Sequence, residues 1–285
     1  MRKMKKSDKK ETSWLVPVVL LLILGILITG VKVLNEIYKK EEIPGKKIPA
    51  KKEKVVEKKE KKREKEIPVA IIIDDCGWNR SIVKELEGIN EPLTLSFLPK
   101  APYSKELIKL LNGKNYEFIL HLPLEPLPPQ QCLDKGLITT EMTDEEINKI
   151  FLDNVYDYLP YIKGINNHMG SLFTSTPDKM EVLLENIKKE NLFFIDSATS
   201  KNTTGYTLAE QMGIKTAKRD IFLDNESNPE YIKEQLNKLI KVAKKNGKCV
   251  AIGHAKKETL KVLKEKLPEL KEEGIKIVPA SSIVE

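Results

Sequence analysis

The chain has 285 residues and a formal net charge of +7, with 49 Lys and Arg against 42 Asp and Glu. The positive charge lies in residues 1–66, which hold 20 basic and 10 acidic side chains and leave 29 basic and 32 acidic ones for the rest. A folded part without basic excess is poorly suited to nucleic-acid phosphates, so no nucleic-acid partner is expected. The length suits one large α/β domain with appendages.

Residues 1–13 are basic, and residues 14–31 form an apolar segment that contains the uncharged run LVPVVLLLILGILITGV. As a helix this run reaches about 26 Å, enough to span a bilayer with local thinning. A buried soluble helix and a cleavable signal peptide are the alternatives. Because no small-x-small cleavage site precedes Lys32, we expect residues 14–31 to be an uncleaved transmembrane helix in contact with lipid.

Residues 32–66 are rich in Lys and Glu, contain almost no aromatic residues and show no sustained heptad. Such a composition is typical of a solvated, disordered tether rather than a coiled coil. Basic residues cluster before the apolar segment and also follow it, and this small asymmetry favours an N-terminus inside the cell. We therefore expect a single-pass protein of the cell membrane with its folded domain, residues 67–285, outside the cytoplasm.

From residue 67 onward, apolar strand-like runs alternate with amphipathic helical patterns. Helix starts are marked by Thr143 with Glu146, a capping box, and by Thr176 and Asn228, each followed by a proline. Strands that alternate with helices predict a mostly parallel sheet, and seven or eight units favour an α/β fold of the closed (β/α) barrel type. An open doubly wound sheet is the alternative. Neither G-x-G-x-x-G nor a P-loop follows a strand, so no nucleotide cofactor is expected.

The predicted first strand, in VAIIIDDCGWN, ends on two adjacent acids, Asp74 and Asp75. Burying carboxylates is costly unless they are paired, hydrogen-bonded or bound to a metal. The chain's three histidines, His121, His168 and His254, also fall at the carboxyl ends of predicted strands. Any one of these residues is equally well explained as a helix cap or a core side chain. In a parallel barrel, however, those ends converge on the active-site face, so the set predicts a divalent metal site, with zinc first by ligand type.

Six segments in this order, IIIDDCGWN, FILHLPLEP, GINNHMGS, FFIDSATS, RDIFLDN and AIGHA, resemble the motifs of the divergent polysaccharide deacetylase family. This family is a distant branch of the metal-dependent carbohydrate esterases, and the resemblance covers residues 67–285. It implies a deformed (β/α) barrel of seven or eight units. It also implies that Asp74 is a general base, that Asp75 and His121 are metal ligands, and that His254 protonates the leaving group.

The chain departs from the family's relatives at two places. Where they have a second ligand histidine four residues after the first, this chain has Glu125. We therefore expect His168 to be the third ligand, with Glu125 as the substitute. The relatives' arginine-containing motif is absent, and NNHMGS lies in its place. Residues expected to orient ligands or sugar hydroxyls are Asn166, Asn167, Ser171, Asp196, Ser197 and Asp224.

These features predict a membrane-tethered, metal-dependent hydrolase that removes N-acetyl or O-acetyl groups from an envelope polysaccharide. One alternative is a glycan-binding or scaffold protein that has kept the barrel and lost turnover, which the two departures would fit. Another is a metal-dependent phosphoesterase, because a metal at the rim of a barrel does not by itself identify the substrate. The proline-rich segment PLEPLPPQQC, residues 123–132, is either a wall of a substrate groove or a surface loop. For a domain outside the cell, a disulfide between Cys76 and Cys132 is an alternative to free thiols at these positions.

Overall fold

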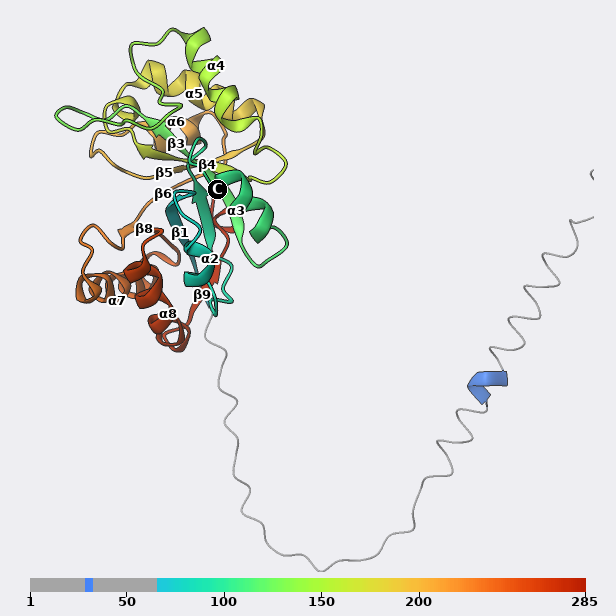
Figure 1. The fold of residues 1–285 in the computed structure, drawn as a ribbon. Coiled ribbons are helices and arrows are strands. Elements are labelled where there is room, and N and C mark those ends of the chain that lie inside the picture. The colour runs from blue at the N-terminus through green and yellow to red at the C-terminus, as the bar shows by residue number, and fades with distance from the viewer. Residues whose placement is uncertain (1–28, 33–65) are drawn as a thin grey trace, which may run out of the picture. The chain divides into compact units, whose positions relative to one another are not determined.

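The computed structural model describes residues 29–32 and 66–285. Residues 29–32 are helical, and no helix among the described residues is long and apolar enough to cross a membrane. Residues 14–28 of the predicted transmembrane segment, and nearly all of the predicted tether, lie outside the described residues. Residues 66–285 form the folded domain (Figure 1).

The domain is built on one nine-stranded sheet in which neighbouring strands run parallel. The strands are β1 (Ile67–Cys76), β2 (Thr94–Phe97), β3 (Glu117–Leu124), β4 (Gly164–Met169), β5 (Phe193–Asp196), β6 (Thr216–Lys218), β7 (Ile221–Phe222), β8 (Cys249–His254) and β9 (Ile275–Val278). Their order is β6-β5-β4-β3-β2-β1-β8-β7, and β9 pairs with the first half of β1.

The outer strands β6 and β7 follow each other in the chain, separated only by Arg219 and Asp220. Three Cα–Cα steps of about 3.8 Å keep Lys218 within about 11 Å of Ile221. The two edges of the sheet must therefore lie near each other, which means that the sheet curls. A curled, parallel sheet fits the predicted (β/α) barrel, with a seam between β6 and β7, and not the open doubly wound alternative.

The helices are α2 (Ile82–Glu85), α3 (Ser104–Leu111), α4 (Asp144–Val155), α5 (Pro177–Lys189), α6 (Gly205–Gln211), α7 (Pro229–Asn246) and α8 (Lys257–Glu272). The predicted capping box is confirmed, since Thr143 Oγ1 accepts from Glu146 N while Thr143 N donates to the Glu146 carboxylate. Asn228 caps α7 by accepting from Glu230 N. Thr176 is the N-cap residue of α5 and is followed by Pro177 at the first helical position, as predicted, but its hydroxyl donates to Leu172 O and makes no side-chain cap hydrogen bond.

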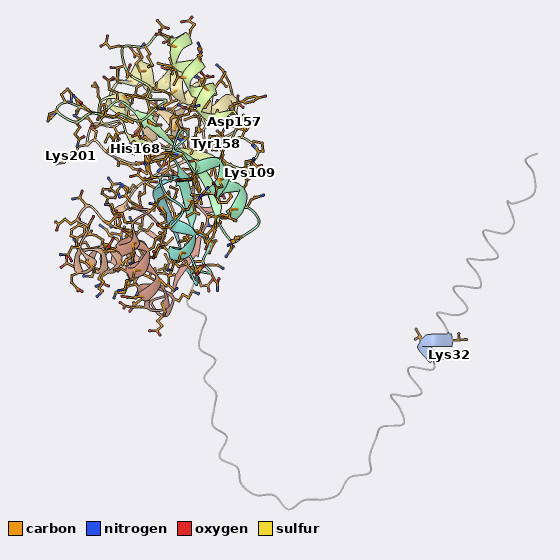
Figure 2. The ribbon with its side chains drawn as sticks, viewed as in Figure 1. Lys32, Lys109, Asp157, Tyr158, His168 and Lys201 are labelled. Carbon is orange, nitrogen blue, oxygen red and sulfur yellow. The ribbon has the colours of Figure 1, made fainter. Side chains whose placement is uncertain are left out.

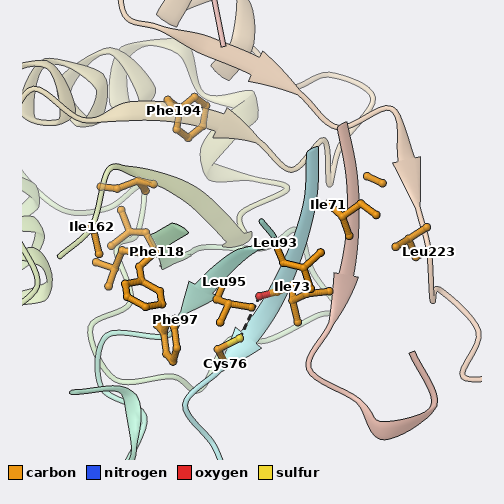
Figure 3. Close-up of a cluster of buried hydrophobic side chains, with 14 of the residues drawn as sticks. Ile71, Ile73, Cys76, Leu93, Leu95, Phe97, Phe118, Ile162, Phe194 and Leu223 are labelled. Atoms are coloured by element: carbon orange, nitrogen blue, oxygen red, sulfur yellow. Dashed lines mark hydrogen bonds between the residues drawn. The ribbon is translucent and has the colours of Figure 1, made fainter. Parts of the chain in front are cut away.

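Successive strand residues face opposite sides of the sheet. One side packs under the helices, and its side chains include Ile71 and Ile73 of β1 and Leu95 and Phe97 of β2 (Figure 3). The other side forms a second apolar cluster inside the curled sheet, made of Ala70, Ile72, Ile119, Phe193, Ile195, Ala217, Val250, Ile252, Ala280 and Ile283. The last two residues follow β9, so the C-terminal segment contributes to this interior cluster.

Gly164 at the start of β4 lies beneath the ring of its strand partner Phe193. A Cβ at this position would come within 2.3 Å of that ring. We therefore expect Gly164→Ala to lower the free energy of unfolding by about 1–3 kcal/mol, the usual cost of overpacking. Urea denaturation would measure it. In a Phe193→Leu background the same change should cost less, and an equal cost in both backgrounds would show that the ring is not responsible.

All three cysteines are buried and free, so the Cys76–Cys132 disulfide is not formed. The thiol of Cys76 donates to Ile73 O at 3.2 Å, within the first strand (Figure 3). Burial is the main cause that raises the pKa of the Cys76 thiol well above its usual value. Cys76 therefore behaves as a small core residue.

Candidate metal and catalytic centre

The interior side of the sheet changes from apolar to polar at the carboxyl ends of its strands. Asp74 comes two residues after Ile72, and His254 comes two residues after Ile252. The strand register pairs Asp74 with His254 on β1 and β8, and pairs His121 with Asn166 on β3 and β4. Because paired residues of neighbouring strands face the same side, these four side chains share the inner rim. This rim is where parallel barrels carry their active sites.

Asp75 reaches the same rim through an unusual backbone conformation. Strict alternation would direct its side chain away from that of Asp74. Instead, the register shifts between Ile73 and Cys76, and Asp75 has a φ of 58°, a left-handed conformation that costs energy in a residue with a Cβ and is concentrated at functional sites. The carboxylates then converge, with Asp74 Oδ2 at 3.5 Å and Asp75 Oδ1 at 3.4 Å from His121 Nε2.

Three potential ligand atoms form a nearly regular triangle at this rim. His121 Nε2 lies 3.4 Å from Asp75 Oδ1 and 3.1 Å from His168 Nδ1, and the last side, from His168 Nδ1 to Asp75 Oδ1, is 3.2 Å. Metal–ligand bonds of about 2.0–2.1 Å at tetrahedral angles place ligand atoms about 3.3 Å apart. Asp75 Oδ1 is buried and has no hydrogen-bond partner among the described residues. The donor set and its spacing fit a zinc-like divalent ion.

Each histidine is held so that its other nitrogen is free to bind a metal. His121 Nδ1 lies 2.8 Å from Asn166 Oδ1, an acceptor, so this nitrogen carries the proton and Nε2 has the lone pair. His168, labelled in Figure 2, places Nε2 at 3.1 Å from Asp134 Oδ2, which leaves Nδ1 for the metal. Such outer partners orient ligand imidazoles and raise their basicity. The second contact comes from a residue that the sequence patterns did not single out.

Asn166 links the acid and the ligand histidine. Its Nδ2 donates to Asp74 Oδ1 at 2.8 Å, and its Oδ1 accepts from Ser96 Oγ at 2.6 Å as well as from His121. Asn166 is completely buried, so it positions these two side chains and has no surface to offer a substrate. Burial, the largest contribution, raises the pKa of Asp74 above its ordinary value despite the lowering effects of His121 and Asn166.

His254, at the end of β8 next to β1, forms a second unit with Asp224. His254 Nδ1 lies 2.9 Å from Asp224 Oδ1, and Asp224 Oδ2 accepts from His254 N at 2.9 Å and from Thr259 Oγ1 at 2.6 Å. The other ring nitrogen, Nε2, lies 3.8 Å from Asp75 Oδ2 and so faces the ligand triangle. Burial alone would lower the pKa of His254, but its bond to Asp224 and the nearby carboxylates raise it.

Glu125, the substitute ligand, lies outside the triangle. Its Oε2 accepts from Thr140 N and from Thr140 Oγ1, both at 2.7 Å. The groups of described residues that are spaced to hold a metal contain His168 and not Glu125. The carboxylate of Glu125 therefore organises the loop that follows β3.

Three of the residues expected to orient ligands or sugar hydroxyls serve mainly to hold loop backbone. Asn167 accepts from Ser197 N and donates to Met169 O. Asp196 accepts from Ala198 N, Thr203 Oγ1 and Tyr206 N, and so supports the start of α6. Ser171 Oγ accepts from Leu127 N. Only Ser197 offers a buried hydroxyl with no hydrogen-bond partner among the described residues.

Three residues of the site were not assigned a role from the sequence: Ser96, Asp134 and Arg219. Arg219 Nε donates to Ser197 O and its Nη2 to Ala198 O, while the guanidinium stacks on Phe222 at 4.8 Å. The ring of Phe222 in turn meets His254 edge-on, with centroids 5.3 Å apart. Ser96 could have been noticed as a hydroxyl inside the apolar run LTLSFLP. Arg219 opens the segment RDIFLDN quoted above, although it was not singled out as a site residue, and no local pattern marks Asp134.

Metal binding should strengthen as pH rises. Burial opposes protonation of His168, but its contacts with Asp75 and Cys132 raise its pKa to about 9. Below that pH the metal-free protein holds a proton that the metal must displace, so affinity should rise by up to about tenfold per pH unit and level off above pH 9. Chelator competition over this range would measure it. A pH-independent affinity would contradict the triangle as the binding site.

A curled parallel sheet with two carboxylates and three histidines at its carboxyl rim defines a (β/α)-barrel protein with an acid–base site suited to a metal. The sequence model of the divergent polysaccharide deacetylase family matches residues 71–284, and the chain belongs to this family. It is 35% identical over 216 residues to the uncharacterized protein YibQ of Escherichia coli K12, covering 76% of this chain and 67% of that protein.

Two further proteins resemble this chain. An uncharacterized protein of Haemophilus influenzae is 28% identical over 208 residues, which is 72% of each chain. The crystal structure of an uncharacterized protein from Agrobacterium tumefaciens C58 superposes with a TM-score of 0.70 at 21% identity, covering 78% of this chain and 90% of that chain. This second likeness shows a common fold.

Proposed function

We propose that the domain is a metal-dependent hydrolase that removes N-acetyl groups, or O-acetyl groups, from an envelope polysaccharide. The observation that carries this proposal is the triangle of Asp75 Oδ1, His121 Nε2 and His168 Nδ1, with sides of 3.1–3.4 Å. Asp74 and His254, two groups able to move protons, lie next to it. The family to which the chain belongs supplies the substrate class, an acetylated polysaccharide.

A divalent ion held by the three ligands, zinc by ligand type, would polarise the acetyl carbonyl and make water a better nucleophile. Asp74 is the general base. Its Oδ1 is occupied by Asn166, which leaves Oδ2 to take the proton from the attacking water. Its raised pKa brings it closer to neutrality, where a base is most effective.

His254 is the general acid. Its Nδ1 is engaged by Asp224, so Nε2 is the atom that gives its proton to the departing amine or alcohol. Asp224 also stabilises the imidazolium from which that proton comes. The base and the acid thus approach the acetyl carbon from two neighbouring strands, β1 and β8.

The proposal includes a membrane tether, with residues 1–13 inside the cell, residues 14–31 across the bilayer and residues 32–66 as a solvated linker. It is supported by the uncharged run at residues 15–31 and by the Lys- and Glu-rich composition after that run. Protease added to cells with a permeable outer layer should cut the linker and release the domain. Full protection of the linker would reverse the orientation.

Metal analysis combined with acetate release from acetylated glycans tests the catalytic proposal. We expect about one divalent ion per chain and acetate release that a chelator abolishes and added zinc restores. Glycan binding without acetate release would identify a scaffold. Release of phosphate from phosphoesters, without acetate release, would identify a phosphoesterase.

A further inference from the structure

A cleft of about 310 Å³ opens beside the metal-binding triangle. Three loops form its walls, and each follows the carboxyl end of a strand: Trp78 comes after β1, residues 98–102 come after β2, and residues 133–135 come after β3. The cleft therefore lies on the same rim as the proposed catalytic residues. Its volume is at the lower end of the range of about 300–1,000 Å³ typical of small-molecule sites.

The cleft exposes large apolar side chains to solvent. Trp78 is 53% exposed, and Leu133 is 88% exposed. Single exposed apolar residues are common, but neighbours that line one concave surface indicate a binding site. Two exposed lysines, Lys100 and Lys135, also line this surface. Lys100 Nζ donates one hydrogen bond to Asp153 O, and its remaining N–H groups and those of Lys135 are further hydrogen-bond donors. An exposed indole next to polar donors suits a ligand that has an apolar face and many oxygens at its edge, which describes a pyranose ring.

The cleft and the triangle share a wall. Asp134 lines the cleft, and its Oδ2 holds His168 Nε2 at 3.1 Å. Pro123 also lines the cleft and lies two residues after His121 on β3. Trp78 is three residues after Asp75. The cleft is therefore linked to the triangle through Asp134, which lines the first and holds a ligand histidine of the second.

We infer that this cleft binds the sugar unit next to the one that carries the acetyl group, with Trp78 stacked on its ring. This inference rests on the proposed function and makes it more specific, because it requires an oligosaccharide or polymer as substrate rather than a free monosaccharide. The oxygens of that neighbouring sugar accept hydrogen bonds from Lys100 and Lys135. Pro123 and residues 133–135, at the two ends of the proline-rich segment, then form one wall of a substrate groove.

The test uses the full-length chain with N-acetylglucosamine and its β-1,4-linked dimer, trimer and tetramer as probes. The chain has two tryptophans, Trp14 and Trp78, so a Trp14→Phe variant makes Trp78 the sole tryptophan reporter. Its fluorescence should change saturably with the dimer and longer probes, and little with the monomer. By calorimetry, Trp78→Ala should weaken trimer binding about tenfold or more, as truncation of an aromatic anchor does.

Two variants are matched controls. Trp78→Phe keeps an aromatic face and should retain most of the affinity. Tyr156→Ala removes an aromatic side chain that is 75% exposed but does not line the cleft, and it should bind the trimer as the parent does. An unchanged Trp78 signal with every probe, or equal losses in Trp78→Ala and Tyr156→Ala, would overturn the inference.

The outcomes separate this inference from the proposed function. If binding depends on sugar length and requires Trp78 but the protein releases no acetate, the sugar-binding cleft is supported and the proposed hydrolytic activity is refuted. If acetate release is equally efficient from monomer and tetramer and is unaffected by Trp78→Ala, sugar binding in the cleft is refuted and the proposed hydrolytic activity is supported. A Trp78 signal that changes with protein dilution rather than with added sugar would show that a second copy of the chain covers the cleft, which also refutes it.

Discussion

Replacing His168 with alanine is expected to remove the bound metal and with it the hydrolytic activity. His168 Nδ1 supplies one corner of a three-residue site, at 3.1 and 3.2 Å from the other two ligand atoms. Loss of a direct ligand should cost more than the about 10–100-fold in metal affinity that loss of an outer partner costs. Asp134→Asn, which alters only the outer partner of His168, should fall in that smaller range. Metal content after dialysis, with competition by a chelator, measures both.

Glu125→Gln is the matched control, because glutamine keeps an acceptor for Thr140 while removing the charge. It should bind metal as the parent does, and its melting temperature should change little. If His168→Ala kept its ion and Glu125→Gln lost it, the third ligand would be Glu125 in the functional state. Loss of cooperative unfolding in His168→Ala would instead be checked with His168→Gln, which keeps a polar side chain of similar length.

Replacing His254 with alanine is expected to lower turnover of an N-acetyl substrate by about 10²–10⁴-fold, the usual contribution of a general acid. Metal content should stay the same, because His254 is not a corner of the triangle and its Nε2 lies 3.8 Å from Asp75 Oδ2. An amine leaves only when it is protonated, whereas the phenolate of an activated aryl acetate leaves unaided. The loss should therefore be much smaller on the aryl acetate.

Steady-state kinetics on both substrates decide this point. Equal losses on the amide and the aryl acetate would exclude the acid role, and loss of the metal would make His254 a ligand. Asp224→Asn provides a second check, because it alters the partner of His254 Nδ1 without removing the imidazole. It should show the same preference for the activated ester, with a smaller loss on the amide.

Much of the architecture followed from local patterns in the sequence. The alternation of apolar strands and amphipathic helices predicted a parallel α/β sheet, and the structure has one. Asp74, His121 and His254 stand out because polar residues break the apolar interior face at the ends of their strands. Since parallel strands end on the same rim, their convergence could be expected without knowing which strands are neighbours. Such inferences need only the period of the strand and the direction of the chain.

Tertiary structure determines three features of the site: which of His168 and Glu125 lies in the triangle, where the sequence analysis favoured His168; the direction of Asp75; and the outer partners of the histidines. Glu125 lies four residues from His121, but Thr140 takes up its carboxylate, whereas His168 arrives from the neighbouring strand. Asp75 faces the centre only because the backbone takes a left-handed conformation where the register with β2 shifts. Asp134 contacts His168 although the two residues are 34 positions apart in the sequence. These contacts depend on loop paths between distant segments, and local periodicity contains no information about those paths.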